Sequence, residues 1–318
     1  MKKFLALVFL ILIVGSFAAF KYIQTTLFSP LIQTPTTFEI EKGSSAQKTA
    51  QMLARQNLAP HPLFARLAMR FYGFDKRLKA GEYLLEQNMS LKDILEKLTS
   101  GKVIMHQLTI PEGLTTSKAL EIIDQNEFLT GSLPQNISEG ALLPETYSFA
   151  KGELKENIVK KAQNDMQKTL DNAWENRAEN LPLKNKNELL ILASIIEKET
   201  GVNAERAKVA SVFINRLNID MPLQTDPTVI YALTLGKSEL GRSLKHKDLD
   251  INSPYNTYLY KGLPPTPICN PGLKAIEAAA KPENTPYLYF VADGLGGHRF
   301  AKTLSEHNRN IGLWLKKK

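Results

Sequence analysis

The sequence predicts an α+β protein with an N-terminal membrane helix, a small α/β domain and a larger mixed α+β domain. First, Phe4–Phe20 is an uncharged, almost wholly apolar run, close to the ~17–25 residues that span a bilayer. Second, short strand and helix patterns alternate between Thr36 and Ile110, whereas longer helical patterns dominate after Pro111. Third, 318 residues are enough for two domains with separate cores.

The N-terminal segment carries its own orientation signal. The basic residues Lys2 and Lys3 place residues 1–3 in the cytoplasm by the positive-inside rule, with residues 4–21 as the transmembrane anchor. Ser16–Ala18 is a small-x-small triplet, so a cleaved signal peptide is the alternative. The apolar run is longer than the ~7–15-residue core of a signal peptide, which favours a retained anchor. Both interpretations place the remaining chain in the same compartment.

Composition excludes several classes of function. The net charge of +8 is spread along the chain, which suits a location near anionic lipid or an acidic polymer. No basic tract is interleaved with aromatic residues, so we expect no nucleic-acid partner. The single cysteine, Cys269, excludes an internal disulfide and is expected to be buried. No cluster has metal-ligand spacing and no nucleotide-binding motif occurs, so we predict no metal and no cofactor.

The small domain is predicted at residues 36–110, after a linker at 22–35 that contains Ser29-Pro30 and Thr34-Pro35. Alternation, capping serines and turn residues define its elements. They are, in order, a strand at Thr36–Glu41, a helix capped by Ser44 or Ser45 and running through Leu58, a helix at Pro60–Tyr72, a strand at Leu78–Leu85, a helix at Leu91–Thr99 capped by Ser90, and a strand at Val103–Ile110.

The larger domain is predicted at residues 111–318 and is mainly helical. Its helices follow apolar stripes at helical spacing, and a Gly-rich turn favours a hairpin near the C-terminus. The expected elements are a helix capped by Thr115 or Thr116 and running through Gln125, helices at Asn157–Leu181, Leu189–Thr200, Ala204–Leu217 with Asn203 as N-cap, from Pro227 with Asp226 as N-cap, and at Leu273–Ala280, then strands at Tyr287–Ala292 and His298–Lys302.

The central helix ends in two acids. Ser194 is the one polar residue in Leu189–Ile196, and Glu197 and Glu199 follow directly. Two residues are about 200° apart on a helix with ~3.6 residues per turn, so the carboxylates should point to different sides. Partial burial raises the pKa of a carboxyl group, which is what a general acid at neutral pH requires. From these residues alone, ordinary solvated glutamates at a helix end remain the alternative.

Several other residues are candidates for binding a sugar. Aromatic faces stack on sugar rings and amides bond hydroxyl groups, which makes Tyr255 and Asn256 candidates. The alternative is a strand with half-buried tyrosines. Gln224 has no evident structural role and is a further candidate. Asp226 serves either as a helix cap or in sugar binding, and Glu145 is either a second carboxylate of the cleft or a turn residue.

Long ordered strings in the second half of the chain resemble the YceG-like family. They are ASIIEKET, VASVFINRL, MPLQTDPTVIYAL, SPYNTYLYKGLPPTPICNPG and TPYLYFVADGLGGHRF, with LPETY around Glu145 as a further match. The resemblance implies an endolytic peptidoglycan lytic transglycosylase with a YceG-like catalytic domain at residues 111–318. It also implies a single-pass protein of the bacterial inner membrane whose catalytic domain is periplasmic. Residues 36–110 resemble a LysM-like domain, which would bind glycan; a spacer is the alternative.

The resemblance also implies roles. It selects Glu197 over Glu199 as the catalytic acid, and Gln224, Asn256, Tyr255, Glu145 and Asp226 as substrate-binding residues are our supporting expectations. The enzyme would cut the MurNAc–GlcNAc bond of nascent glycan strands, leave 1,6-anhydro-MurNAc ends and terminate elongation. Implied partners are glycan strands, the inner membrane and peptidoglycan synthases. Two alternatives remain: a hydrolytic muramidase with a second carboxylate, and a membrane-tethered glycan-binding scaffold without catalysis.

Overall fold

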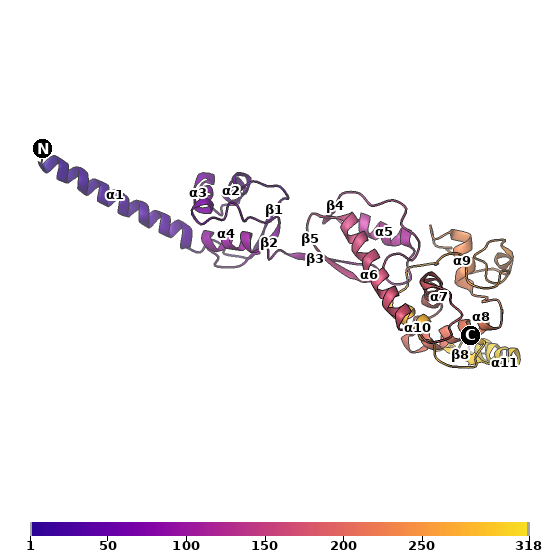
Figure 1. Cartoon of the computed structure of the whole chain (residues 1–318). Helices are drawn as coiled ribbons and strands as arrows, with labels where there is room; N and C mark the ends of the chain where they lie inside the picture. Colours follow the sequence, from indigo (N-terminus) through magenta and orange to yellow (C-terminus); the bar gives the residue numbers. More distant parts are fainter. Residues whose placement is uncertain (1, 317–318) are drawn as a thin grey trace. The chain divides into compact units, whose positions relative to one another are not determined.

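The computed structural model describes residues 2–316 and shows a mixed α+β protein (Figure 1). The chain forms two compact units. The first runs to His106 and also includes Ser148–Glu153, and the second comprises Gln107–Tyr147 and the chain from Leu154 onward. Within the described residues the strands form four two-stranded sheets.

Helix α1 (Lys2–Phe28) is long and apolar enough over Lys3–Phe28 to cross a membrane, which is consistent with a single-pass anchor. The prediction of a linker at residues 22–35 was therefore wrong for its first part, because the helix continues to Phe28. No glycine or proline interrupts residues 21–28, and Pro30 follows the helix end, where proline is common. Leu27 and Ile32 are buried in the core of the first unit, so this segment is part of the fold.

The first unit contains β1 (Thr36–Ile40), α2 (Ala46–Arg55), α3 (Pro62–Phe71), β2 (Gly81–Leu85) and α4 (Leu91–Ser100). This confirms the predicted order of elements. Strands β1 and β2 pair antiparallel, and the core beneath them is apolar. Its fully buried side chains include Phe38, Leu53, Met69, Tyr83 and Leu95. The LysM-like character of this unit stays a prediction.

Two short strand pairs follow, with helix α5 (Thr116–Asp124). Strand β3 (Met105–Thr109) pairs with β5 (Thr146–Ala150), and β4 (Leu129–Thr130) pairs with β6 (Glu153–Leu154). Residues 148–153 belong to the first unit, whereas the sequence analysis placed them in the second domain. Strand pairing between distant segments is a long-range contact that local periodicity does not encode.

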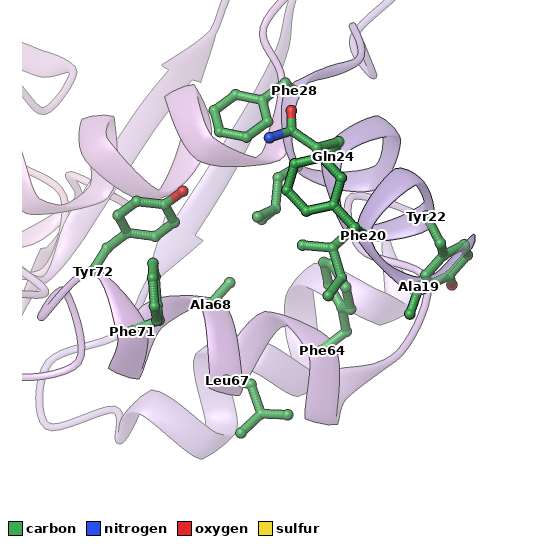
Figure 2. Close-up of a pocket in the computed structure, with 12 residues that line it drawn as sticks. Ala19, Phe20, Tyr22, Gln24, Phe28, Phe64, Leu67, Ala68, Phe71 and Tyr72 are labelled. Atoms are coloured by element: carbon green, nitrogen blue, oxygen red, sulfur yellow. The ribbon is translucent and has the colours of Figure 1, made fainter. Parts of the chain in front are cut away.

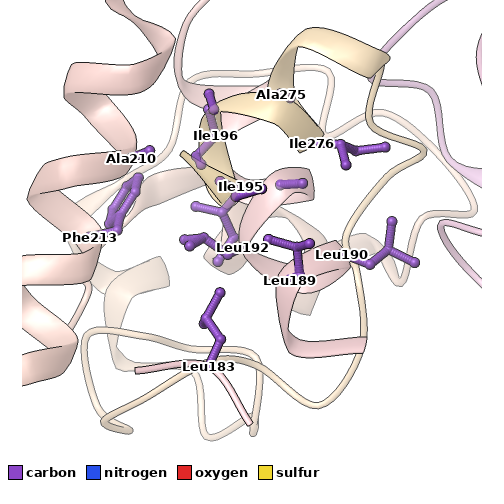
Figure 3. Close-up of a cluster of buried hydrophobic side chains, with 14 of the residues drawn as sticks. Leu183, Leu189, Leu190, Leu192, Ile195, Ile196, Ala210, Phe213, Ala275 and Ile276 are labelled. Atoms are coloured by element: carbon purple, nitrogen blue, oxygen red, sulfur yellow. The ribbon is translucent and has the colours of Figure 1, made fainter. Parts of the chain in front are cut away.

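The second unit is organised around helix α7 (Lys186–Glu199), in which every residue from Leu189 to Ile196 is buried. Figure 3 shows the side chains of this run in the main cluster, with Phe213 and Ile276 among their neighbours. The other elements are α6 (Lys155–Glu175), a 3₁₀ turn (Asn203–Glu205), α8 (Arg206–Asn218), α9 (Asp226–Thr234), a 3₁₀ turn (His246–Asp250), α10 (Leu273–Ala280), β7 (Tyr289–Ala292), β8 (His298–Ala301) and α11 (Leu304–Leu315).

Cys269 is buried, as predicted. Two predicted helix caps, Asn203 and Asp226, were wrong. Asn203 opens a 3₁₀ turn, and α8 begins only after Glu205. Asp226 is the first residue of α9, and its N-cap is Thr225. The Asp226 carboxylate does not cap the helix because it accepts a hydrogen bond from the hydroxyl of Tyr258.

Ser194 allows the contribution of buried hydrogen bonds to the stability of the second unit to be measured. Its hydroxyl donates to the carbonyl of Ile191 and accepts the backbone N–H of Ile268 at 3.0 Å. Ser194→Ala should lower the free energy of unfolding by about 1–3 kcal/mol, because the buried N–H loses its partner. The measurement is the denaturant midpoint of the detergent-solubilised chain, with the exposed Ser305→Ala as control. Equal midpoints for both variants would contradict this role.

Candidate active site

Glu199 is the last residue of α7, and its carboxylate turns into the second unit. The helix ends here because Thr200 adopts an extended conformation with φ −143°. The Thr225 hydroxyl donates a hydrogen bond to Oε1 of Glu199. Burial is the main cause that raises the pKa of the Glu199 carboxyl, and the nearby charge of Asp226 adds to it. The hydrogen bond from Thr225 opposes this rise.

An open cavity of about 460 Å³ lies beside this carboxyl group. Its lining is half polar, with acidic, basic, amide and aromatic side chains facing the same space, as in a site that binds a polar ligand. We call it the Glu199 cleft. Its lining residues are Glu199, Phe213, Arg216, Leu223, Gln224, Asp226, Tyr258, Tyr289, Phe290, Val291, Leu304 and His307.

The segment between α8 and α9 forms one wall of the cleft and is held by Thr257. The backbone N–H of Gln224 donates to the carbonyl of Thr257, and that of Thr225 donates to its hydroxyl, both at 3.1 Å. Gln224 has a positive φ of 49°, which few residues other than glycine adopt and which costs of order 1–3 kcal/mol. The strained backbone places the exposed Gln224 side chain at the cleft.

Asp226 and Tyr258 form a hydrogen-bonded pair on the same wall. The hydroxyl of Tyr258 donates to Oδ1 of Asp226 at 2.6 Å. Burial and the neighbouring carboxylate of Asp226 raise the pKa of Tyr258 far above its ordinary value, so the phenol keeps its proton. The pair therefore offers an aromatic face and a carboxylate to a ligand on the same wall.

Arg216 connects this wall to the hairpin. Its Nε donates to the carbonyl of Leu288 at 2.7 Å, and its Nη1 donates to that of Leu223 at 2.8 Å. Its guanidinium group lies 5.2 Å from the ring centroid of Tyr289. Burial and the charge of Arg216 lower the pKa of His307, so the imidazole is neutral at neutral pH. The cleft thus contains one cation close to its acids.

Glu197 points elsewhere, as the helical spacing predicted. Both of its carboxylate oxygens accept hydrogen bonds from Arg206, at 3.0 and 3.1 Å, and Oε2 also accepts the N–H of Gly272 at 2.9 Å. The Glu197 and Arg206 side chains are only 4% and 5% exposed. Burial raises the pKa of Glu197, while the N–H of Gly272 and the charge of Arg206 oppose the rise. Glu197 does not line the Glu199 cleft.

The other predicted substrate residues divide between the cleft and the scaffold. Gln224 and Asp226 line the cleft, whereas Asn256, Tyr255 and Glu145 do not. Asn256 is fully buried and bonds the carbonyls of residues 249 and 251 and the N–H of residue 258. Every polar group of its amide is occupied, so none remains for a glycan.

Tyr255 and Glu145 also have protein partners. The Tyr255 ring lies 4.9 Å from that of Tyr231, and its hydroxyl hydrogen-bonds the hydroxyl of Thr266. Glu145 is exposed, and its carboxylate accepts the backbone N–H of Thr146. Tyr255 thus packs against the core of the second unit.

The sequence analysis missed Arg216, Tyr289 and His307 as members of the cleft, and Thr225 as the hydrogen-bond donor to Glu199. A basic residue near the end of a helix and an aromatic residue in a hairpin strand are common, and neither carries a local signal. Arg216, Tyr258 and Tyr289 lie within the strings that resemble the family, but the sequence analysis gave them no role.

Comparison with known proteins identifies the family. A family model described as the YceG-like family matches residues 38–312. This chain belongs to the YceG-like family. The matched region includes every residue of the Glu199 cleft.

Two bacterial relatives bear the name "Endolytic murein transglycosylase". That of Bacillus subtilis (strain 168) is 35% identical over 315 residues, covering 87% of this YceG-like chain and 84% of the relative. That of Streptococcus pneumoniae (strain D39) is 31% identical over 357 residues, covering 96% of this chain and 63% of the relative. The fold is similar to the crystal structure of a yceG-like protein from Listeria monocytogenes, with a TM-score of 0.53, 33% identity, and coverage of 87% of this chain and 99% of that one.

The two glutamates should respond oppositely to neutralisation. The folded pKa of Glu199 lies above its ordinary value, so the protein loses stability as the pH rises through that range. Glu199→Gln removes this loss and should raise the denaturant midpoint at pH 8 more than at pH 4.5. Glu197→Gln removes the nearer of the two carboxylates that pair with the buried Arg206, leaving Glu112 at 3.6 Å, and should lower the free energy of unfolding by about 3 kcal/mol. Shifts of the same sign in both variants at pH 8 would contradict these assignments.

Proposed function

We propose that this protein is an endolytic peptidoglycan lytic transglycosylase that cuts the MurNAc–GlcNAc bond of nascent glycan strands. The proposal is supported by membership of the YceG-like family and by relatives of that name. The observation that carries it is the Glu199 carboxyl, which combines a raised pKa with a place in an open polar cavity. A protonated acid beside a groove that can hold a sugar chain is the minimum this reaction needs.

A single acid suffices for the chemistry. Glu199 donates its proton to the oxygen that links the two sugars, and the bond from that oxygen to C1 of the muramic acid breaks. The resulting carboxylate accepts the proton of the 6-hydroxyl group, and the oxygen of that group bonds to C1. The product is a 1,6-anhydro end, no water is consumed, and the enzyme regains its starting protonation state.

The choice of Glu199 over Glu197 rests on their surroundings. Glu197 already accepts three hydrogen bonds, two of them from a buried cation, and this pairing favours its charged form. Glu199 faces the cleft with a hydroxyl donor and a neighbouring carboxylate. Glu197 then positions the end of α7 through its pair with Arg206. The prediction that Glu197 is the acid stays open to the variant test below.

The cleft also suggests how a glycan is held. The exposed amide of Gln224 can bond sugar hydroxyl groups, and Asp226 can accept a hydrogen bond from them. The ring of Tyr258 offers a face for stacking on a sugar. Tyr255 and Glu145 lie outside the cleft, so as substrate contacts they would belong to more distant positions of a glycan strand.

A hydrolytic muramidase is the second candidate, because Asp226 places a second carboxylate in the same cleft. A hydrolase would use that carboxylate to activate water or to form a covalent intermediate. Its product would carry the mass of one additional water molecule. The hydrogen bond from Tyr258 to Asp226 restrains the carboxylate on the cleft wall.

The cellular setting follows from the anchor and the family. We infer a single-pass inner-membrane protein with a cytoplasmic N-terminus and a periplasmic catalytic domain, since Lys2 and Lys3 precede the apolar run that begins at Phe4. There it would terminate the elongation of strands made by peptidoglycan synthases, its expected partners. Residues 36–110, as a LysM-like domain, would add a second glycan contact.

Glu199→Gln should reduce cleavage of purified peptidoglycan strands by about 10²–10⁴-fold, the usual contribution of a general acid. Products of the full-length protein are identified by mass spectrometry. Anhydro ends are expected from the unaltered chain, and products heavier by one water would instead support the muramidase. Glu188→Gln, in the first turn of the same helix, is the control and should cleave normally. Full activity of a folded Glu199→Gln protein, with loss in a folded Glu197→Gln protein, would reverse the assignment.

The pH dependence of cleavage gives a further test. A general acid must be protonated before it reacts, so the rate should fall as the pH rises through the elevated pKa of Glu199. This alkaline decline should be absent from the residual activity of Glu199→Gln. The measurement is the cleavage rate from pH 4 to pH 9, and an unchanged decline in the variant would assign it to another group.

A further inference from the structure

Helix α3 exposes an apolar stripe on the side that does not face the core. Ala65, Ala68 and Met69 are buried. Leu63, Leu67 and Phe71, which lie one helical turn apart, are 56%, 57% and 84% exposed. Single exposed apolar residues are ordinary, but a continuous apolar stripe on a helix marks a surface that another apolar phase covers.

The stripe continues into a hollow beside the end of α1. This hollow has a volume of about 620 Å³, and Figure 2 shows side chains of α1 and α3 around it. Aromatic rings dominate its wall, and the rings of Tyr22 and Phe64 meet edge to face at 6.1 Å. The lining residues are Ala19, Phe20, Tyr22, Ile23, Gln24, Leu27, Phe28, Phe64, Leu67, Ala68, Phe71 and Tyr72.

The length of α1 sets the depth of this hollow in a membrane. The apolar segment of 26 residues is about 39 Å long at ~1.5 Å per residue. The hydrocarbon core is only ~30 Å thick, and the headgroup regions bring the total to ~40–45 Å. About 20 residues cross the hydrocarbon core, so a core that begins at Lys3 ends near Tyr22. The last turns of α1, up to Phe28, therefore lie at headgroup level, where aromatic side chains are enriched.

The charges of α3 suit the same depth. Arg66 and Arg70 are exposed, and α3 contains no acidic residue. Lys76 and Arg77 follow, with Asp75 as the one acid of the segment from Pro62 to Arg77. Helices that lie in a membrane interface combine an apolar face of Leu and Phe with Arg or Lys. Arginine stems can lie along apolar surface while the guanidinium groups reach the headgroups.

We propose that α3 and residues 20–28 form a membrane-docking surface. Its occupant is the headgroup–acyl boundary of the bilayer that α1 enters, and Arg66 and Arg70 bind anionic lipid headgroups there. The proposal rests on α1 being a membrane anchor, as in the proposed function. The docked helix holds the first unit against the bilayer through two elements, so that it does not swing on a single span.

The single native cysteine makes a direct test practical. Cys269 is fully buried, so an introduced surface cysteine reacts selectively with a nitroxide label. The labelled sites are Leu67→Cys and Phe71→Cys, with Leu84→Cys as an exposed leucine of the same unit and Leu12→Cys within α1. Full-length protein is placed in vesicles of phosphatidylethanolamine and phosphatidylglycerol. Collisions of each label with oxygen, which enters lipid, and with a water-soluble nickel complex are then compared.

We expect labels at residues 67 and 71 to collide mainly with oxygen, as the label at residue 12 does, and the label at residue 84 to collide mainly with nickel. If residues 67 and 71 resemble residue 84 while residue 12 is in lipid, the docking surface is overturned and the anchor stands. If residue 12 is itself in water, the anchor fails and the proposal falls with it. Spin–spin broadening at residue 71 that disappears on dilution in lipid would show that a second copy of the protein covers the stripe. That result would also overturn the membrane-docking proposal.

The lipid charge is tested with Arg66→Gln combined with Arg70→Gln. Basic residues near an anionic surface are attracted to it, so the double variant should move the labels at residues 67 and 71 toward nickel in anionic vesicles. In vesicles of phosphatidylcholine alone, the unaltered and double-variant proteins should give the same accessibility. An unchanged accessibility in anionic vesicles would overturn the role of the arginines.

Discussion

The complete burial of one helical run, Leu189–Ile196, is the constraint on which the second unit depends. Helices α6, α8 and α10 pack around it, so α7 has no freedom to rotate or slide. Because the core is densely packed, a helix fixed within it also fixes the backbone of the residues at its end. The first residues that leave the core are therefore held in fixed directions, and those residues are the two glutamates. Packing that stabilises the fold also sets the geometry of the site.

The end of α7 gives two chemically identical side chains opposite surroundings. Glu197 meets a buried guanidinium and a backbone N–H, which compensate a negative charge. Glu199 is buried beside a second carboxylate, and these two effects raise its pKa against the opposing hydrogen bond from Thr225 and the charge of Arg216. Pairs of acids whose environments differ in this way commonly divide structural and catalytic roles. The division here depends on a rotation of about 200° along one helix.

Local patterns predicted the elements well, because helix periodicity and caps are local properties. Helix α10 was predicted with its observed bounds, Leu273–Ala280, and the hairpin followed from its Gly-rich turn. The roles of polar residues depended on which partners the fold brings to them, which their own residue type does not show. Asn256 carries an amide suited to a sugar, but the fold uses that amide to hold its own loop. Likewise, the polar and proline residues after residue 21 suggested a linker, although the helix continues to Phe28 and Leu27 and Ile32 are buried.

The loop that carries Gln224 forms a wall of the cleft, and hydrogen bonds hold it whereas packing holds α7. The conformation of this loop is fixed by hydrogen bonds to Thr257 and by the strained backbone of Gln224. Arg216 adds three bonds to carbonyl groups of the loop and the hairpin. A rigid helix therefore presents the acid, while a loop tied at several points presents the groups suited to a sugar. Because loop bonds open locally more readily than a packed core, the wall can adjust to a glycan while the acid keeps its position.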